Sequence, residues 1–102
     1  MESKKFGVKT IGDVIALFGS CNDQTKLLLQ EVCQFQYRAE PIRPEWPVNR
    51  QTLKTLSGAV RERSMERADR SLELGNYRDI AKMWDQTALE IVTKVKKIAK
   101  FV

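Results

Sequence analysis

Apolar residues recur at helical spacing over most of this chain, and no segment alternates apolar and polar residues as a half-buried strand does. The clearest recurrence lies near the C-terminus, where apolar residues return every seven positions in two series. The two series are Tyr77, Trp84, Ile91 and Ile98, and Ala81, Ala88, Val95 and Val102. This pattern predicts an amphipathic helix whose apolar stripe faces a core or a second subunit.

Capping residues predict two helices in the first part of the chain. Thr10 and Asp13 have the spacing of a capping box, which indicates a short helix over 11–18. Ser20 or Asn22 can cap a second helix that continues to about residue 38. The apolar positions of that second helix fall near helical spacing: Leu28, Leu29, Val32, Cys33 and Phe35.

Prolines at positions 41, 44 and 47 separate these helices from the rest of the chain. They exclude regular structure over 40–48 and predict an extended connection, which Trp46 can pin to the core. Asn49 can then cap a third helix of roughly 25 residues, and Gly75 is expected to end it.

Asn76 and Asp79 supply a capping box for the fourth helix, so the chain is expected to be all-α. The expected fold is one small bundle of about four helices over 1–102, in which 1–9 form a basic segment without fixed structure. Since a chain of 102 residues buries only a modest core, we also expect a dimer. Self-association is assigned to the seven-residue recurrence: Tyr77, Ala81, Trp84, Ala88, Ile91, Val95 and Ile98.

The composition argues against catalysis and against a metal centre. The chain has no histidine, so the commonest general base is missing and two cysteines alone cannot complete a zinc site. If Cys21 and Cys33 share one helix they lie ~18 Å apart, too far for a disulfide, so two reduced thiols are expected. We therefore predict no enzymatic activity, no cofactor, no transmembrane segment and an intracellular, cytoplasmic location.

The net charge of +5 and the pI near 9.4 favour an acidic partner. Basic residues of the third helix form two stripes at helical spacing. The candidate phosphate contacts are Arg50, Lys54 and Arg61 in the first stripe, and Arg63, Arg67 and Arg70 in the second. The alternative is an ordinary solvated helix whose four acidic residues offset these bases. The apolar face of this helix rotates near 61–64, as it would if the helix changed its packing partner midway or spanned a subunit boundary.

Lysines also gather at the end of the fourth helix: Lys94, Lys96, Lys97 and Lys100. Cations are favoured at a helix C-terminus, which accounts for part of this cluster. The remainder suits an anionic partner or an anionic membrane surface.

The hairpin from Leu72 to Leu89 resembles one helical hairpin of a tetratricopeptide repeat, and is also similar to the hairpin in nucleotide-binding helical domains of prokaryotic toxins and defence proteins. It occurs once, whereas solenoids need several repeats. The resemblance therefore implies a helical hairpin and nothing more.

The layout of the whole chain resembles the small suppressor of RNA silencing of insect nodaviruses. The similar stretches are Val48-Asn49-Arg50, Arg67-Ala-Asp-Arg70, and the turn at Gly75 followed by Ile80-Ala81. The resemblance implies a viral homodimer in the host cytoplasm, with long helices along one face of double-stranded RNA and with Arg67 and Arg70 facing phosphates. This chain differs from that family in an additional N-terminal segment and in a longer apolar last helix.

The leading hypothesis is sequence-independent binding of nucleic acid, preferably double-stranded RNA, by a homodimer. Duplex RNA is recognised chiefly by shape, through phosphate and 2′-hydroxyl contacts that Arg, Lys and Ser can make. The alternative is a helical protein-interaction module, such as a chaperone, adaptor or assembly subunit, that binds its partner through the amphipathic last helix.

Overall fold

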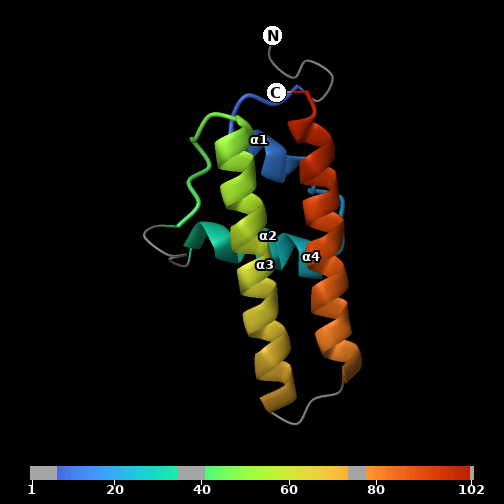
Figure 1. Ribbon diagram of the computed structural model, residues 1–102. Coiled ribbons are helices and arrows are strands. Elements are labelled where there is room, and N and C mark those ends of the chain that lie inside the picture. The colour runs from blue at the N-terminus through green and yellow to red at the C-terminus, as the bar shows by residue number, and fades with distance from the viewer. Residues whose placement is uncertain (1–6, 35–40, 74–77, 102) are drawn as a thin grey trace.

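The computed structural model describes residues 7–34, 41–73 and 78–101. Within these ranges the chain forms four α-helices and no strand, which confirms the all-α prediction. The helices are α1 (Ile11–Ala16), α2 (Asp23–Gln34), α3 (Arg50–Glu73) and α4 (Arg78–Ala99). Figure 1 shows α3 and α4 as a long antiparallel hairpin, with α1 and α2 behind it on one side.

The predicted capping box begins α1. The Thr10 hydroxyl accepts a hydrogen bond from the Asp13 amide at 3.2 Å, and the Asp13 carboxylate accepts from the amides of Lys9 at 2.9 Å and Thr10 at 3.1 Å. These bonds satisfy N–H groups at and just before the helix start, where no intrahelical acceptor is available. α1 ends at Ala16, earlier than predicted, because the next amides donate to carbonyls three residues back and form tight turns.

The proline connection is bound to the start of α1. The amides of Ile11 and Gly12 donate to the carbonyls of Trp46 at 2.9 Å and Pro44 at 2.8 Å. Proline lacks an N–H but keeps its carbonyl, so the connection supplies acceptors to a helix start. A Cβ at Gly12 would lie 3.3 Å from the Pro44 side chain, so glycine permits this approach. Trp46 is half-buried against the core, as predicted.

Asparagine side chains cap the next two helices. Asn22 Oδ1 accepts from the Thr25 amide at 2.9 Å, which identifies one of the two predicted caps of α2. Asn49 Oδ1 accepts from the Thr52 amide at 2.9 Å, and the Thr52 hydroxyl accepts from the Asn49 amide at 3.0 Å. This reciprocal pair confirms Asn49 as the start of α3.

One core joins the helices. Its fully buried side chains come from every helix and from the proline connection: Ile11, Val14, Leu28, Leu29, Ile42, Leu53, Leu56, Val60, Ile91, Val92, Val95 and Ile98. Cys21 and Cys33 are both half-buried free thiols, as predicted.

The seven-residue recurrence of α4 lies in this core. The side chains of Trp84, Ala88, Ile91, Val95 and Ile98 are each at most 7% exposed. Packing within the chain therefore explains the recurrence, and these buried side chains do not form an exposed seam for a second copy. Ala81 is half-buried.

Several predicted features lie outside the described residues: Tyr77, Val102, the turn at Gly75 and Asn76, the end of the second helix near residue 38, and residues 1–6 of the N-terminal segment. The prediction that this segment lacks fixed structure is wrong for residues 7–9, because Val8 is 2% exposed in the core and the Lys9 carbonyl accepts a hydrogen bond from the Val48 amide at 3.0 Å.

The rotation of the apolar face of α3 follows from its neighbours. Residues such as Leu56 and Val60, in its first half, are buried where α2 and α4 both contact α3. Figure 1 shows that α2 crosses the hairpin near its middle and that the hairpin extends past it. The buried residues nearer the turn, Ser64 and Ala68, lie further around α3 than Leu56 and Val60, as helical periodicity requires. The interpretation that α3 changes its packing partner midway agrees with this arrangement.

Candidate nucleic-acid interface

Arg63 and Arg67, two of the six predicted phosphate contacts, bind a carboxylate inside the protein. Nε of Arg63 and Nε of Arg67 each donate to Oε1 of Glu31 at 2.8 Å, and Nη2 of Arg67 donates to Oε2. Glu31 lies on α2 and is only 7% exposed. A buried carboxylate is costly unless it is paired and hydrogen-bonded, so both guanidiniums hold α2 against α3. Both guanidiniums therefore already have a partner within the chain, and their contact with phosphates stays a prediction.

The same contacts keep Glu31 ionised. The hydrogen bond from Arg67, supported by that from Arg63, lowers the pKa of Glu31 below its ordinary value, although burial acts in the opposite direction. The Arg67 guanidinium also lies 4.7 Å from the centroid of the Trp84 ring on α4, a cation–π distance. These four residues, called the Glu31 cluster below, tie α2, α3 and α4 together.

The first predicted stripe is in a different environment. Arg50, Lys54 and Arg61 are exposed, and helical periodicity places them about half a turn around α3 from Arg63. Together with Lys96 of α4, these three side chains line a groove of about 540 Å³ between the two helices. The rest of the lining is apolar or small: Leu53, Ser57, Gly58, Val95 and Ala99. The structure thus brings half of the predicted basic residues to one groove.

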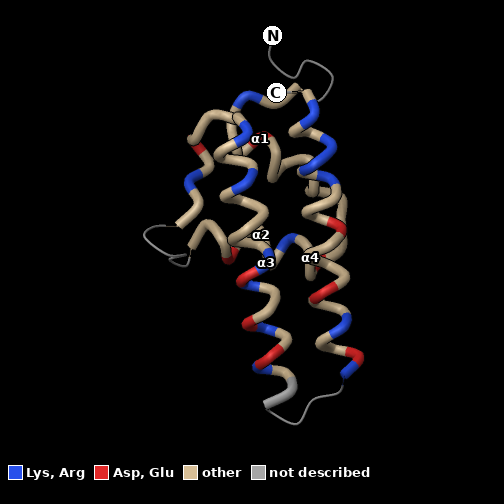
Figure 2. The backbone as a smooth tube through the Cα atoms, viewed as in Figure 1, with Lys and Arg blue, Asp and Glu red and all other residues tan. Residues whose placement is uncertain are grey.

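Charge is segregated along the hairpin. Residues 50–61 and 91–101, which form the end nearest α1, hold seven bases and no acid. Residues 62–73 and 78–90 hold seven acids and five bases. Figure 2 shows the result as a basic end of the hairpin and an end of mixed charge near its turn. The groove lies in the basic end, so no carboxylate from these hairpin segments offsets its cations.

Arg70 and Lys94 are placed less favourably for an anion. Arg70 is exposed but lies in the mixed end, next to Asp69. Nζ of Lys94 donates to the Leu17 carbonyl at 3.3 Å and lies 4.9 Å from the centroid of the Phe18 ring. Lys94 therefore holds α4 against the end of α1.

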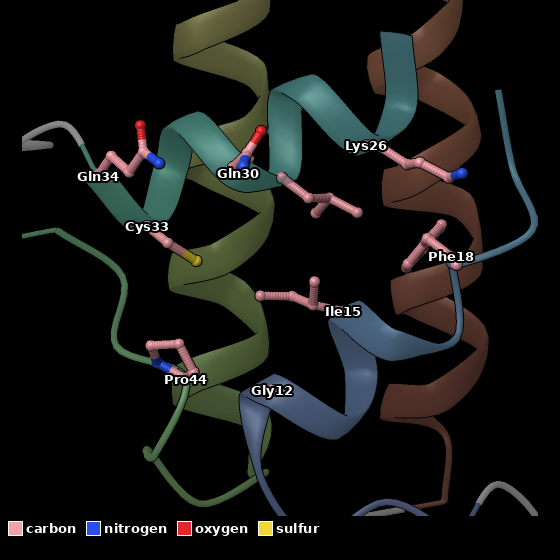
Figure 3. Close-up of a pocket in the computed structure, with 10 residues that line it drawn as sticks. Gly12, Ile15, Phe18, Lys26, Gln30, Cys33, Gln34 and Pro44 are labelled. Carbon is pink, nitrogen blue, oxygen red and sulfur yellow. The ribbon is translucent and has the colours of Figure 1, made fainter. Parts of the chain in front are cut away.

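A second hollow, of about 620 Å³, lies between α1 and α2. Figure 3 shows Ile15 and Cys33 directed toward this space from the two helices, with Phe18 at one end. Among the described residues that line it, Lys26 is the charged one. Burial raises the pKa of the Cys33 thiol, so the sulfur stays protonated and weakly nucleophilic near neutral pH. This chemistry does not provide a reactive centre.

A third hollow, of about 230 Å³, lies on the groove side of the hairpin, nearer its turn. Met65 of α3 and Leu89 of α4 line it and are 61% and 58% exposed. Arg61 and Asp85 also line it, and Arg61 is shared with the basic groove. Two large apolar side chains at this exposure form a surface that water solvates poorly.

Two residues of these sites, Glu31 and Lys96, were not predicted from the sequence to lie where they do. Glu31 is acidic but lies beside the apolar positions Leu28 and Val32 of its helix, which is the one signal of its burial. Lys96 belongs to the lysine cluster of the last helix, and only the antiparallel packing of α3 and α4 places it opposite Lys54. In both cases the contacting residues are far apart in the sequence, so no local pattern predicts the contact.

The described ranges contain no group of three or more Cys, Asp or Glu residues arranged to hold a metal ion. None of their helices has a stretch long and apolar enough to cross a membrane. No protein-family model, curated protein or solved structure matches the chain.

Proposed function

We propose that this protein binds nucleic acid without reading its sequence, through the groove lined by Arg50, Lys54, Arg61 and Lys96. The supporting observation is the grouping of these four exposed cations in a stretch of hairpin without acids. Phosphate backbones attract such clusters through Coulomb forces and counterion release, and neither requires base contacts. The sequence-independent term alone can supply substantial affinity.

The shape of the groove suits a polymer of phosphates. Arg50 and Arg61 are eleven residues apart, so they span ~16 Å along α3. Lys96 stands across the groove on α4, and the Ser57 hydroxyl lies between the bases as a neutral donor. Double-stranded RNA is recognised through phosphate and 2′-hydroxyl groups, which these donor types can contact. It is therefore the first probe.

The nodavirus resemblance also implies duplex RNA and a role in suppressing RNA silencing, and both remain part of this proposal. The resemblance assigns phosphate contacts to Arg67 and Arg70, whereas Arg67 binds Glu31. The proposal therefore relies on the other stripe. The alternative, a protein-interaction module that uses the apolar stripe of α4, loses support because that stripe is buried within the chain.

The test compares two triple variants of equal charge change. Arg50→Gln/Lys54→Gln/Lys96→Gln removes three cations of the basic end, and Arg70→Gln/Arg78→Gln/Lys82→Gln removes three exposed cations of the mixed end. Binding of a labelled RNA duplex is measured over a salt series, beside a DNA duplex and a single-stranded RNA. We expect the first variant alone to flatten the log–log salt slope, by roughly 0.7–0.9 per lost contact. Equal losses in both variants would indicate a response to net charge and would remove the groove from the proposal.

A further inference from the structure

The open face of the hairpin carries an apolar patch that the described chain leaves uncovered. Figure 1 shows α1 and α2 behind α3 and α4, so they cover the opposite side. Met65 and Leu89 are the most exposed large apolar residues in the described ranges. The hollow between them is large enough to receive an apolar side chain, and the buried Ala88 and Val92 contribute to its lining.

The charges around this patch are self-complementary. Arg61 precedes Met65 by one turn of α3, and Asp85 precedes Leu89 by one turn of α4. Because α3 and α4 are antiparallel, Arg61 and Asp85 lie at opposite ends of the Met65–Leu89 pair. Neither is in an ion pair within the part of the chain that the structure describes. A two-fold axis through the pair and across the helices exchanges the two ends, which brings each Arg61 toward the other copy's Asp85.

We infer that a second copy of this chain packs against this face, with the two hairpins antiparallel and with Met65 and Leu89 at the centre. The two-fold relation supplies apolar contact at the centre and two Arg61–Asp85 pairs at its ends. Antiparallel packing also places the mixed-charge end of each hairpin beside the basic end of the other, whereas parallel packing would place the basic ends together.

This interface shares Arg61 with the basic groove but requires no contact with nucleic acid, and it differs from the sequence-predicted seam. It uses Met65 and Leu89, which are exposed, in place of the buried α4 residues. Arg50 and Lys54, which lie ~22 Å and ~16 Å along α3 from Met65, are the groove cations of α3 furthest from the centre of the interface.

The experiment is a charge exchange, read by sedimentation equilibrium without nucleic acid. We expect the wild type to dimerise, and Arg61→Asp and Asp85→Arg each to weaken dimerisation at least ten-fold, because each homodimer then holds two like-charge pairs. An equimolar mixture of the two variants should dimerise again, since one copy then presents Asp at both positions and the other presents Arg. Within one chain neither variant can restore its own pair, so recovery on mixing is specific to contact between copies.

Leu89→Gln tests the apolar centre without a charge change and should also weaken dimerisation. Far-UV circular dichroism is the control for folding, and each of these variants should remain helical. A monomeric wild type at all concentrations, single variants that dimerise like wild type, or a mixture that stays monomeric would each overturn the inference. None of these outcomes depends on RNA binding, so failure here and failure of the proposed function are separate results.

Discussion

Arg67 of α3 donates from both Nε and Nη2 to the carboxylate of Glu31 on α2, across 36 residues of sequence. This bidentate pair lies where α2 crosses the hairpin, and Arg63 adds a third hydrogen bond to the same carboxylate. Bidentate Arg–carboxylate contacts fix orientation as well as adding energy. The pair thus sets the angle and register of α2 on the hairpin, and through α2 the position of α1.

Glu31→Gln should destabilise the fold. Glutamine keeps the side-chain size but removes the charge that neutralises Arg63 and Arg67. Removing one partner of a fully buried ion pair costs about 3–5 kcal/mol, and these arginines are partly exposed, so we expect about 2–3 kcal/mol. Urea denaturation followed by circular dichroism measures this loss. Glu62→Gln, an exposed change on the same hairpin, is the control and should stay within about 0.5 kcal/mol of wild type.

The Glu31 cluster should also make the fold sensitive to acid. Because the pKa of Glu31 is lower in the folded chain than in the unfolded chain, its ionised form stabilises the fold above the ordinary carboxylate range. That stability is lost as the pH falls from the ordinary carboxylate range through the lower, folded-state pKa. Unfolding free energies of wild type and Glu31→Gln should therefore converge across this range. A gap that stays constant with pH would contradict the assignment.

Asp13 contributes to the same acid response in the same direction. Hydrogen bonds from the Lys9 and Thr10 amides lower its pKa below the ordinary value. Glu31→Gln should therefore retain some pH dependence, and the further change Asp13→Asn should reduce it. Unfolding curves of the double variant at the same pH values measure the remainder.

The four helices, and the starts of the first three, could be predicted from the sequence because local signals determine these features. Thr10, Asn22 and Asn49 each cap the helix that their position predicts, and the prolines mark the connection. The surface against which each helix packs could not be predicted from local signals. The heptad spacing of α4 fits a seam between subunits and a core within one chain equally well, and only the packing of α2 and α3 decides between them.

Only part of the candidate site could be predicted from the sequence, again because local patterns do not show which helices pack together. Helical spacing separated the two basic stripes correctly, since it depends on α3 alone. Which stripe stays exposed depends on Glu31, a residue of another helix, and on the antiparallel approach of Lys96. Neither contact has a signature near the residues it affects.

Ser64→Ala should cost about 1 kcal/mol, and Ser64→Leu more. The Ser64 side chain is 1% exposed, and its hydroxyl donates to the Trp84 carbonyl at 2.7 Å, where α3 and α4 are in close contact. Alanine removes one buried hydrogen bond, whereas leucine must push the two helices apart, which typically costs about 1–3 kcal/mol. Thermal unfolding of both variants measures the order. A stable Ser64→Leu variant would mean that the hairpin packs less closely than described.

Arg67→Gln and Arg70→Gln should have different effects, although they replace neighbours of the same predicted stripe. Arg67→Gln breaks the bidentate contact with Glu31 and the stacking on Trp84, so it should lower the unfolding free energy by about 2 kcal/mol or more. Arg70 is exposed in the mixed end, so Arg70→Gln should change stability by less than about 0.5 kcal/mol. Under conditions where circular dichroism shows both variants fully folded, each should bind a labelled RNA duplex within about two-fold of wild type, with the salt slope unchanged, because neither residue lines the groove. A flatter slope in the folded Arg67→Gln variant would show that this guanidinium leaves Glu31 to contact phosphate, and would return the second stripe to the interface.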